Sequence, residues 1–200
     1  MSGYKIFGDS VSGNCLKVKW TADLLGVPYE WTQTSVLKGE TRTPEFLHLN
    51  PAGQVPVLLT PKGKALAQSN AIILYLAEKE GGGLIPDKPL ARAKIYEWLF
   101  WEQYSHEPYI AVRRFQKAYL GTPDANLDPR LMERGLAALA RMECQLTDEA
   151  FIAGENFSLA DIALVAYTRV AHEGGFNLDA FPAVKAWVRR VEKHLDLEAA

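Results

Sequence analysis

Residues 44–76 read PEFLHLNPAGQVPVLLTPKGKALAQSNAIILYL, and they contain three structural signals in succession. The first is a helix start, because Thr43 can cap a helix whose first position is a proline and whose first turn carries an acid. This short helix is predicted to end at Asn50-Pro51, since the residue before a proline avoids helical geometry.

The second and third signals are a hairpin and a longer helix. Two short apolar runs, 57–60 and 64–67, flank the turn residues Pro61-Lys62-Gly63 and predict paired antiparallel strands. Ser69 is then predicted to cap a helix over 70–79, in which the apolar side chains repeat at helical spacing. The stretch therefore predicts helix–strand–strand–helix.

The residues before this stretch add a strand–helix–strand unit. An aromatic and β-branched run at 4–7 predicts a strand, 14–25 has near-helical apolar spacing, and 29–34 alternates like a second strand. Tyr4 lies inside the first strand and is interpreted as a core residue. A first strand–helix–strand unit favours a parallel pair, so residues 1–80 are predicted to form an α/β domain.

The residues after this stretch predict helices only. A Gly- and Pro-rich segment at 81–89 is interpreted as a linker, and residues 90–200 as an all-helical domain. Pro108 is expected to kink or split the first helical pattern. The helical patterns cover four ranges: 90–119, 128–147, 159–171 and 183–195. Within the third, Ser158 and Asp161 have the spacing of a capping box, to which only a structural role is assigned.

Composition excludes several classes of protein. The 200 residues are 48% hydrophobic and 23% charged with a formal net charge of −2, so neither disorder nor nucleic-acid or membrane-surface binding is indicated. No secretory signal and no membrane-length apolar run is seen. The two cysteines, Cys15 and Cys144, show no metal-binding spacing, which favours a reducing cytoplasm and no metal. Cys144 is interpreted as core.

Five segments together resemble the cytosolic glutathione transferase family, in order and at family spacing. They are 7–18 (FGDSVSGNCLKV), 44–58, 68–76, 154–164 (GENFSLADIAL) and 180–191 (AFPAVKAWVRRV). The resemblance implies a thioredoxin-like glutathione-binding domain followed by an all-helical domain. It also implies a cytoplasmic homodimer that uses glutathione as co-substrate, with a small hydrophobic electrophile and no metal.

The resemblance places most of the glutathione site in the first domain. It implies a cis peptide bond at Val55-Pro56 and pairing of the tripeptide with the Val55 backbone, to which Gln54 adds a hydrogen bond. It implies that the glutamyl carboxylate binds at Gln68-Ser69, on a helix N-terminus suited to anions. The family often has Glu before this Ser, and Gln68 loses that charge. For Val55-Pro56, a loop proline that only sets up the next strand is the plain alternative.

Two basic residues match family positions that meet the glycine carboxylate of glutathione, Lys38 and Arg42. One plant class has His where this chain has Thr41, so the contact of that class with the glycine carboxylate is not transferred in full to this chain. A solvated surface side chain remains the alternative for both.

The catalytic residue implied by the resemblance is Ser12, with Asn14 in a Ser-x-Asn arrangement. This resembles the serine-type active sites of bacterial and phi, zeta or theta-like classes, and no Tyr stands in the loop. Ser12 would stabilise the glutathione thiolate by a hydrogen bond. Cys15 is an alternative thiol, because a Cys at a helix N-terminus can have a lowered pKa and form a mixed disulfide. A buried Cys15 is the structural alternative.

The resemblance implies that the electrophile lies between the first loop of the chain and the kinked helix after the linker. Tyr104, His106 and Arg113 are polar residues among aromatic ones, which suits a mostly apolar pocket. A core position for Trp98 and Trp101, with the polar groups exposed, is the alternative.

Three other functions stay open at the level of sequence. The scaffold can serve as a glutathione-dependent peroxidase, isomerase or thiol-disulfide reductase, for which Cys15 is the discriminating residue. It can be a non-catalytic glutathione-binding interaction module, or a structural protein that no longer binds the tripeptide. The favoured function is conjugation of glutathione to a small electrophile in detoxification.

Overall fold

A computed structural model describes residues 3–200, which fall into two compact units, Met1–Leu84 and Ile85–Ala200. The division lies inside the segment 81–89 that was predicted as a linker. The first unit contains all the named strands, and the second is built from helices.

The first unit is built on a four-stranded mixed sheet of order β2-β1-β3-β4. β1 (Tyr4–Gly8) pairs in parallel with β2 (Tyr29–Gln33) and antiparallel with β3 (Val57–Leu59), which pairs antiparallel with β4 (Ala65–Ala67). The parallel pair and the hairpin are thus confirmed. β1 is central, which explains why Ile6 is fully buried and Tyr4 nearly so.

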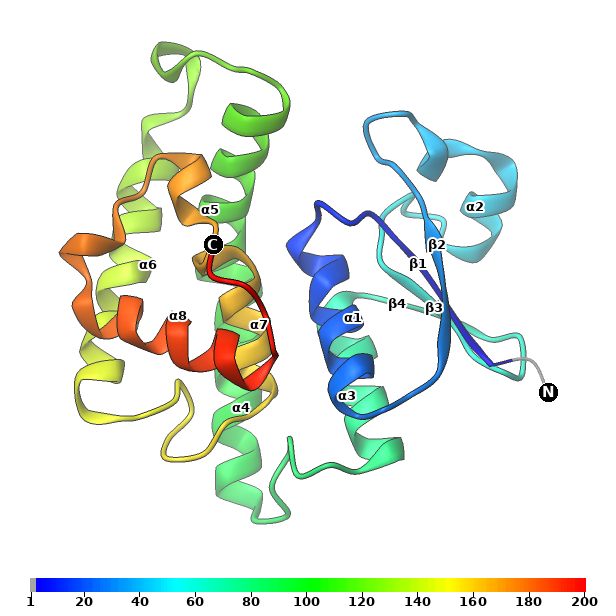
Figure 1. Cartoon of the computed structure of the whole chain (residues 1–200). Coiled ribbons are helices and arrows are strands. Elements are labelled where there is room, and N and C mark those ends of the chain that lie inside the picture. Colours follow the sequence, from blue (N-terminus) through cyan, green and yellow to red (C-terminus); the bar gives the residue numbers. More distant parts are fainter. Residues whose placement is uncertain (1–2) are drawn as a thin grey trace. The chain divides into compact units, whose positions relative to one another are not determined.

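Helices cover both faces of this sheet. α1 (Gly13–Leu24) and α3 (Ser69–Glu80) pack against each other on one face, and α2 (Pro44–Leu49) lies on the other (Figure 1). On the α2 side, Phe46 meets Phe7 edge to face. The Thr43 hydroxyl accepts a hydrogen bond from the Phe46 amide at 3.3 Å, so the predicted cap of α2 is confirmed. This architecture is the predicted thioredoxin-like domain.

The start of α3 corrects one prediction. The N-cap residue is Gln68, which has a φ of 73° and makes no side-chain capping bond. Ser69 is the first helical residue, and its hydroxyl donates to Asn14. The chain enters the helix through a left-handed φ at a non-glycine residue, which a sequence pattern does not reveal. The Ser69 hydroxyl is therefore available for contacts other than its own helix.

The second unit is arranged around α7 (Leu159–Thr168), in which every residue is buried. α4 (Pro89–Trp101), α5 (Glu107–Arg114) and α8 (Pro182–His194) all contact α7, and α6 (Pro129–Asp148) packs on α5 and α8 (Figure 1). The predicted all-helical domain is confirmed.

Pro108 divides the first long helical pattern, as predicted. A π-helical turn over Glu102–His106 lies directly before the second segment, α5. Proline lacks an amide hydrogen and its ring collides with the carbonyl four residues earlier, so a wider turn relieves the clash. The same helix ends in a second π turn, Phe115–Tyr119.

The capping box at the start of α7 is also confirmed. The Asp161 carboxylate accepts hydrogen bonds from the Ser158 amide at 2.9 Å and the Ser158 hydroxyl at 3.0 Å. It also accepts from the Ile152 amide and the Trp187 indole, both at 2.8 Å. Burial raises the pKa of the Asp161 carboxyl, and these four donors act against that rise. Asp161 therefore joins three segments of the helical core.

Cys144 departs from its prediction, because it is exposed on α6 rather than buried. Its neighbours Met142 and Leu146 face the core instead. Among residues 3–200, no helix combines the length and the apolar character needed to cross a bilayer.

Candidate functional site

Strand register brings three separate segments to one end of the sheet. Phe7 near the end of β1 pairs with Val57 at the start of β3, and Val57 pairs with Ala67 at the end of β4. Residues 9–12, Val55-Pro56 and Gln68-Ser69 immediately adjoin these paired positions. The loop after β1, the bend before β3 and the start of α3 therefore lie at the same edge of the first unit.

Ser12 occupies the N-cap position of α1 but does not use its side chain as a cap. Its φ and ψ are −87° and 118°, and its backbone carbonyl accepts from the amides of Cys15 and Leu16 at 3.0 and 2.9 Å. Its own amide donates to the Asp9 carbonyl at 3.0 Å. The backbone of Ser12 is thus fixed, while its hydroxyl makes no capping bond to α1.

Asn14 connects the starts of the two helices on this face. Its side-chain carbonyl accepts from the Lys17 ammonium at 2.8 Å and from the Ser69 hydroxyl at 3.0 Å. Lys17 is fully buried and Ser69 is 5% exposed. Asn14 was grouped with Ser12 in the catalytic pair, but these contacts tie it to Ser69 at the predicted carboxylate position.

The bend before β3 is organised by Asn50. Its side chain donates to the Gln54 carbonyl at 2.7 Å and accepts from the Ala52 amide at 3.2 Å. The Val55-Pro56 bond is cis, as the resemblance implied. The Gln54 side chain is exposed, Val55 is half-buried and Pro56 is buried.

Arg42 lies against this bend. Its guanidinium donates to the Ala52 carbonyl at 3.3 Å, and a Cβ on Gly53 would lie 2.4 Å from the Arg42 Nη1 atom. Gly53 has a φ of 61°, the left-handed region in which glycine is favoured. Lys38 is exposed on the neighbouring 35–40 turn, and its amide donates to the Ser35 hydroxyl at 3.3 Å. Both cations lie on segments that flank the same end of the sheet.

Cys15 has the environment of a protonated structural thiol. It is fully buried, and its sulfur accepts a hydrogen bond from the Asp9 amide at 3.3 Å. Burial raises the pKa of the Cys15 thiol to about 11, although contacts with Ser12 and the Asp9 amide oppose the rise. A reactive thiol requires a lowered pKa, so burial and the raised pKa favour the structural alternative for Cys15.

Tyr4 lies at the opposite end of β1 from this loop. Its hydroxyl contacts Lys79 and donates to Glu80 at 3.2 Å, and burial raises the pKa of its phenol. The ring also meets Tyr75 edge to face. Tyr4 is therefore a core residue at the far end of the sheet, in agreement with its interpretation from sequence.

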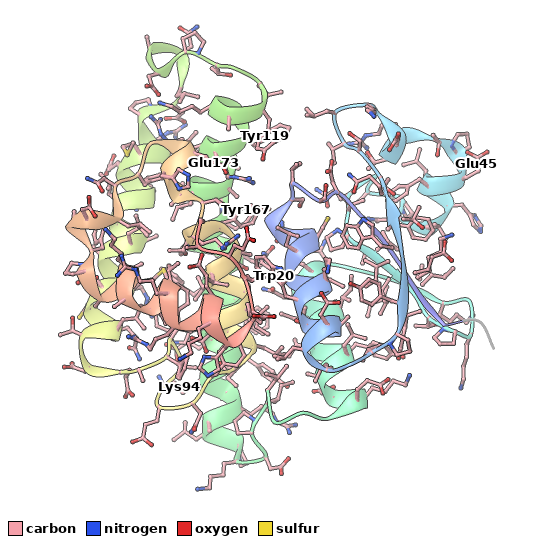
Figure 2. All side chains as sticks on the ribbon, viewed as in Figure 1. Trp20, Glu45, Lys94, Tyr119, Tyr167 and Glu173 are labelled. Carbon is pink, nitrogen blue, oxygen red and sulfur yellow. The ribbon has the colours of Figure 1, made fainter. Side chains whose placement is uncertain are left out.

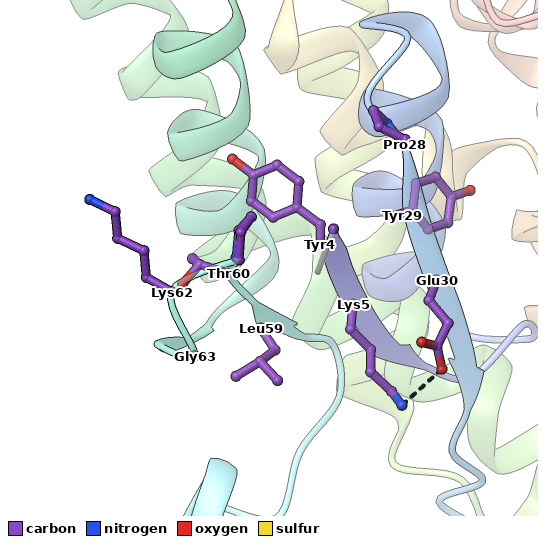
Figure 3. A pocket seen from close by; sticks show the side chains of 11 residues that line it. Tyr4, Lys5, Pro28, Tyr29, Glu30, Leu59, Thr60, Lys62 and Gly63 are labelled. Atoms are coloured by element: carbon purple, nitrogen blue, oxygen red, sulfur yellow. Dashed lines mark ion pairs between the residues drawn. The ribbon is translucent and has the colours of Figure 1, made fainter. Parts of the chain in front are cut away.

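Two hollows in the first unit lie outside the converging segments. One of about 740 Å³ is lined by the starts of β1 and β2 and the hairpin turn, where Lys5 pairs with Glu30 at 2.8 Å (Figure 3). The other, of about 380 Å³, lies between α2 and the sheet beside Phe7 and Phe46. The first is at the sheet end opposite Ser12.

The three residues predicted for an electrophile pocket do not share one environment. Tyr104 is 82% exposed, whereas His106 is fully buried and hydrogen-bonded to the Thr168 hydroxyl at 2.9 Å. Arg113 is 7% exposed and donates to the Gly174 carbonyl at 2.8 Å and to Asp124 at 3.1 Å. His106 and Arg113 thus hold the helical unit together, because the π turn directs His106 into the core. Of the three predicted residues, only Tyr104 is exposed, and the electrophile pocket stays a prediction.

The next residue along the chain, Arg114, also has a structural role. It donates to Glu173 at 2.8 Å and to the Tyr119 hydroxyl at 2.7 Å. Figure 2 shows Tyr119 and Glu173 on separate segments of the helical unit, which this buried guanidinium joins. In the part of the chain that the structure describes, no group of three or more His, Cys, Asp and Glu side chains is arranged to hold a metal ion.

Three residues of the converging segments were missed from sequence: Asp9, Lys17 and Asn50. Asn50 carried a usable signal, because Asn before Pro favours a turn. Lys17 gave none, since a lysine on a helix is ordinarily exposed. Asp9 gave no signal either, because many loop residues follow a strand directly. Its role is seen only from its hydrogen bonds with Gln33 of β2 and with the Val36 amide.

Comparisons with known proteins cover nearly the whole chain. Residues 11–79 match the family model described as Glutathione S-transferase, N-terminal domain, and residues 96–194 match Glutathione S-transferase, C-terminal domain. The chain is 32% identical over 197 residues to Glutathione S-transferase 3 of Zea mays, covering 94% of this chain and 88% of the maize protein.

Solved structures give the same result. A glutathione S-transferase from Pseudomonas fluorescens Pf-5 is 48% identical with a TM-score of 0.92, and 96% of each chain is covered. A second family member from Pseudomonas fluorescens Pf-5, solved with two glutathione bound, is 25% identical with a TM-score of 0.84 and covers 98% of this chain and 93% of its own.

Proposed function

Because this chain belongs to the glutathione S-transferase family, we propose that it binds glutathione and transfers its thiolate to a small hydrophobic electrophile. The observation that carries the proposal is the placement of Ser12 at the start of α1 with no capping bond from its side chain. A hydroxyl in that position can donate to a sulfur anion held in front of the helix.

The tripeptide is proposed to lie across the converging segments. Its glutamyl carboxylate would accept from the amide and hydroxyl at the start of α3, where Ser69 is held by Asn14. Its backbone would pair with Val55 in the manner of an added strand, beside Gln54. Gln68 would accept from the ligand ammonium, and Lys38 and Arg42 would attract the glycine carboxylate.

A hydrogen bond from Ser12 and the N-terminus of α1 can together lower the pKa of the glutathione thiol without a general base. A free thiol has a pKa of about 8.5, and lowering it by about two units takes about 2.7 kcal/mol. A hydrogen bond to a charged group contributes about 1.5–3 kcal/mol, and a helix N-terminus adds about 0.3–1 kcal/mol. Ser12 and α1 together therefore supply the required stabilisation.

Ionisation gives only part of the rate. A two-unit shift raises the thiolate fraction about 25-fold, but a Brønsted slope near 0.45 makes each anion about 8-fold less nucleophilic. The net gain is about threefold, so most of the acceleration comes from holding the electrophile beside the sulfur. Ser12 is proposed to activate and orient the thiolate, and no covalent enzyme intermediate forms.

Family membership also supports a homodimeric state and a cytoplasmic location, both of which are part of this proposal. The serine-type assignment, resembling the phi, zeta and theta-like classes, rests on Ser12 and Asn14. Sedimentation of the purified chain tests the dimer, since a monomeric mass at micromolar concentration contradicts it.

The catalytic part is tested by comparing Ser12→Ala with Cys15→Ala in two assays, conjugation of glutathione to a chloronitrobenzene and reduction of a glutathione mixed disulfide. The proposal predicts that conjugation depends on Ser12 and that neither activity requires Cys15. Dependence of disulfide reduction on Cys15, with conjugation absent, supports the reductase alternative instead. Glutathione binding without turnover on a panel of electrophiles supports the non-catalytic one.

A further inference from the structure

Asp9 is a buried carboxylate at the junction of two loops. It follows β1 directly and is 5% exposed. One carboxylate oxygen accepts from the Gln33 side chain at 2.9 Å and from the Val11 amide at 3.3 Å. The other accepts from the Val36 amide at 3.3 Å. One side chain therefore holds both the loop that carries Ser12 and the segment that follows β2.

Gln33 adds a second link between the same two loops. Its amide group donates to Asp9, and its side-chain carbonyl accepts from the Ser10 amide at 3.2 Å and the Trp31 indole at 3.3 Å. Gln33 is itself exposed at the end of the edge strand β2. The Ser10–Ser12 loop is thus tied to β2 through side chains as well as through the sheet.

The segment after β2 is closed on itself by hydrogen bonds between its two ends. The Ser35 amide donates to the Glu40 carboxylate at 2.6 Å, and the Glu40 amide donates to the Ser35 carbonyl at 3.1 Å. Lys38 lies at the tip of this closed turn and Arg42 follows it. The bond from Val36 to Asp9 therefore fixes the place of the whole turn relative to the Ser12 loop.

We propose that Asp9 is a positioning residue that couples the contact made by Ser12 with the contacts made by Lys38 and Arg42 at the other end of the ligand. The inference rests on the proposed function, since it concerns how the same glutathione site is preorganised. Without Asp9, the two loops can each fold, but their separation is no longer set. Affinity for an extended ligand that touches both loops then falls, because the free-energy cost of ordering the two loops reduces the free energy of binding.

The coupling is measured by isothermal titration calorimetry with glutathione on four proteins: wild type, Asp9→Asn, Lys38→Ala and the double variant. Asp9→Asn keeps the side-chain shape but turns one acceptor into a donor facing an amide donor. It is expected to weaken glutathione binding about tenfold, the scale of one hydrogen bond to a charged group. Lys38→Ala is expected to weaken binding several-fold in the wild type and less in the Asp9→Asn background.

The matched control is Asp23→Asn, which makes the same charge change on α1 at a carboxylate that contacts Lys19 and Tyr29 instead. It should bind glutathione as the wild type does. Should Asp9→Asn fail to fold, Gln33→Ala removes an exposed partner of the same network and is expected to weaken binding about threefold.

Two results overturn the inference while leaving the proposed function intact. One is wild-type affinity in folded Asp9→Asn or Gln33→Ala, and the other is an equal effect of Lys38→Ala in both backgrounds. A merely structural Asp9 would lower the melting temperature without either change. If the wild-type protein binds no glutathione, the proposed function and this inference both fall.

Discussion

Ser158 and Ser12 both stand immediately before a helix, yet their hydroxyls differ in use. The Ser158 hydroxyl donates to Asp161 in the first turn of α7, where both residues are buried and the carboxylate has four donors. Ser12 fixes α1 through its backbone and makes no side-chain capping bond, although its hydroxyl contacts the Cys15 thiol. The first arrangement keeps its polar groups within the fold, whereas the second keeps the half-buried Ser12 hydroxyl out of the helix cap, where it contacts the Cys15 thiol.

The difference separates stability from chemistry in this molecule. A satisfied buried network stabilises the fold, and breaking it leaves several donors without partners. The Ser12 hydroxyl makes no capping bond, and a thiol is a weak hydrogen-bond partner, so its removal is expected to change ligand chemistry more than folding. Variants of the two sites should therefore affect different measurements.

The largest effect is expected for Asp161→Ala. Removing the carboxylate leaves buried donors from Ile152, Ser158 and Trp187 unsatisfied, which should cost about 3 kcal/mol or more of unfolding free energy. Urea denaturation measures this loss, and turnover per folded molecule should stay within twofold.

The control for that variant is Asp128→Ala, which removes an ordinary helix cap. Asp128 accepts from the Arg130 amide at the exposed start of α6. Its loss should cost only about 1 kcal/mol. A cost at Asp161 no greater than at Asp128, or a loss of turnover without a loss of stability, would show that the capping box is not mainly structural.

Ser12→Ala is expected to lower kcat/KM for conjugation about tenfold at pH 6.5. At this pH about sixfold of the loss comes from ionisation and the rest from orientation of the thiolate. Without the hydroxyl, the pKa of the bound thiol rises toward the free value, so the deficit should shrink as pH increases above about 8.5. A pH profile of kcat/KM measures the shift.

The matched control is Ser10→Ala, an exposed serine two residues earlier in the same loop. It should retain the wild-type profile, and both variants should keep the wild-type melting temperature within about 1 °C, since neither removes a capping bond. A Ser12→Ala profile that superimposes on that of Ser10→Ala would remove Ser12 from the mechanism.

A smaller effect is expected for Lys17→Met. This change leaves the Asn14 oxygen without its ammonium donor and loosens the hold on Ser69. The KM for glutathione should rise about fivefold with kcat within twofold, the scale of one net hydrogen bond. Lys19→Met on the exposed face of α1 is the control, because Lys19 pairs with Asp23 instead. Equal KM values for the two variants would argue against a role for the Asn14 network in binding.

The smallest effect concerns the cysteines. With a pKa of about 11, Cys15 is about one part in a thousand thiolate at pH 8, and it is also fully buried. Iodoacetamide should label only Cys144 in the native protein and both cysteines in denaturant. Cys144→Ala should then give no native labelling, and Cys15→Ala should conjugate within about twofold of wild type. Rapid labelling of Cys15 in the native protein would support the alternative that Cys15 is a reactive thiol.

Much of the fold could be predicted because its signals are local. The cap at Thr43, the hairpin, the break at Pro108 and the Ser158–Asp161 box each depend on residues within a few positions of one another. The start of α3 was harder to predict, because Gln68 adopts a left-handed φ although it is not a glycine.

The site was harder to predict because its contacts join distant segments. The Asn14–Ser69 bond spans 55 positions and the Asp9–Val36 bond spans 27, and no local pattern contains either pair. Helical spacing did not predict the burial of His106, which lies in a π turn. Family resemblance located the segments, and only tertiary structure showed which side chains each one uses.

The most direct test is an ultraviolet titration of the thiolate of bound glutathione in wild type, Ser12→Ala and Ser10→Ala. The account predicts that the wild type and Ser10→Ala ionise the bound thiol about two pH units below the free value, and that Ser12→Ala loses at least half of this shift. A bound thiol that ionises at the free value in all three proteins, or equally early in all three, would contradict it.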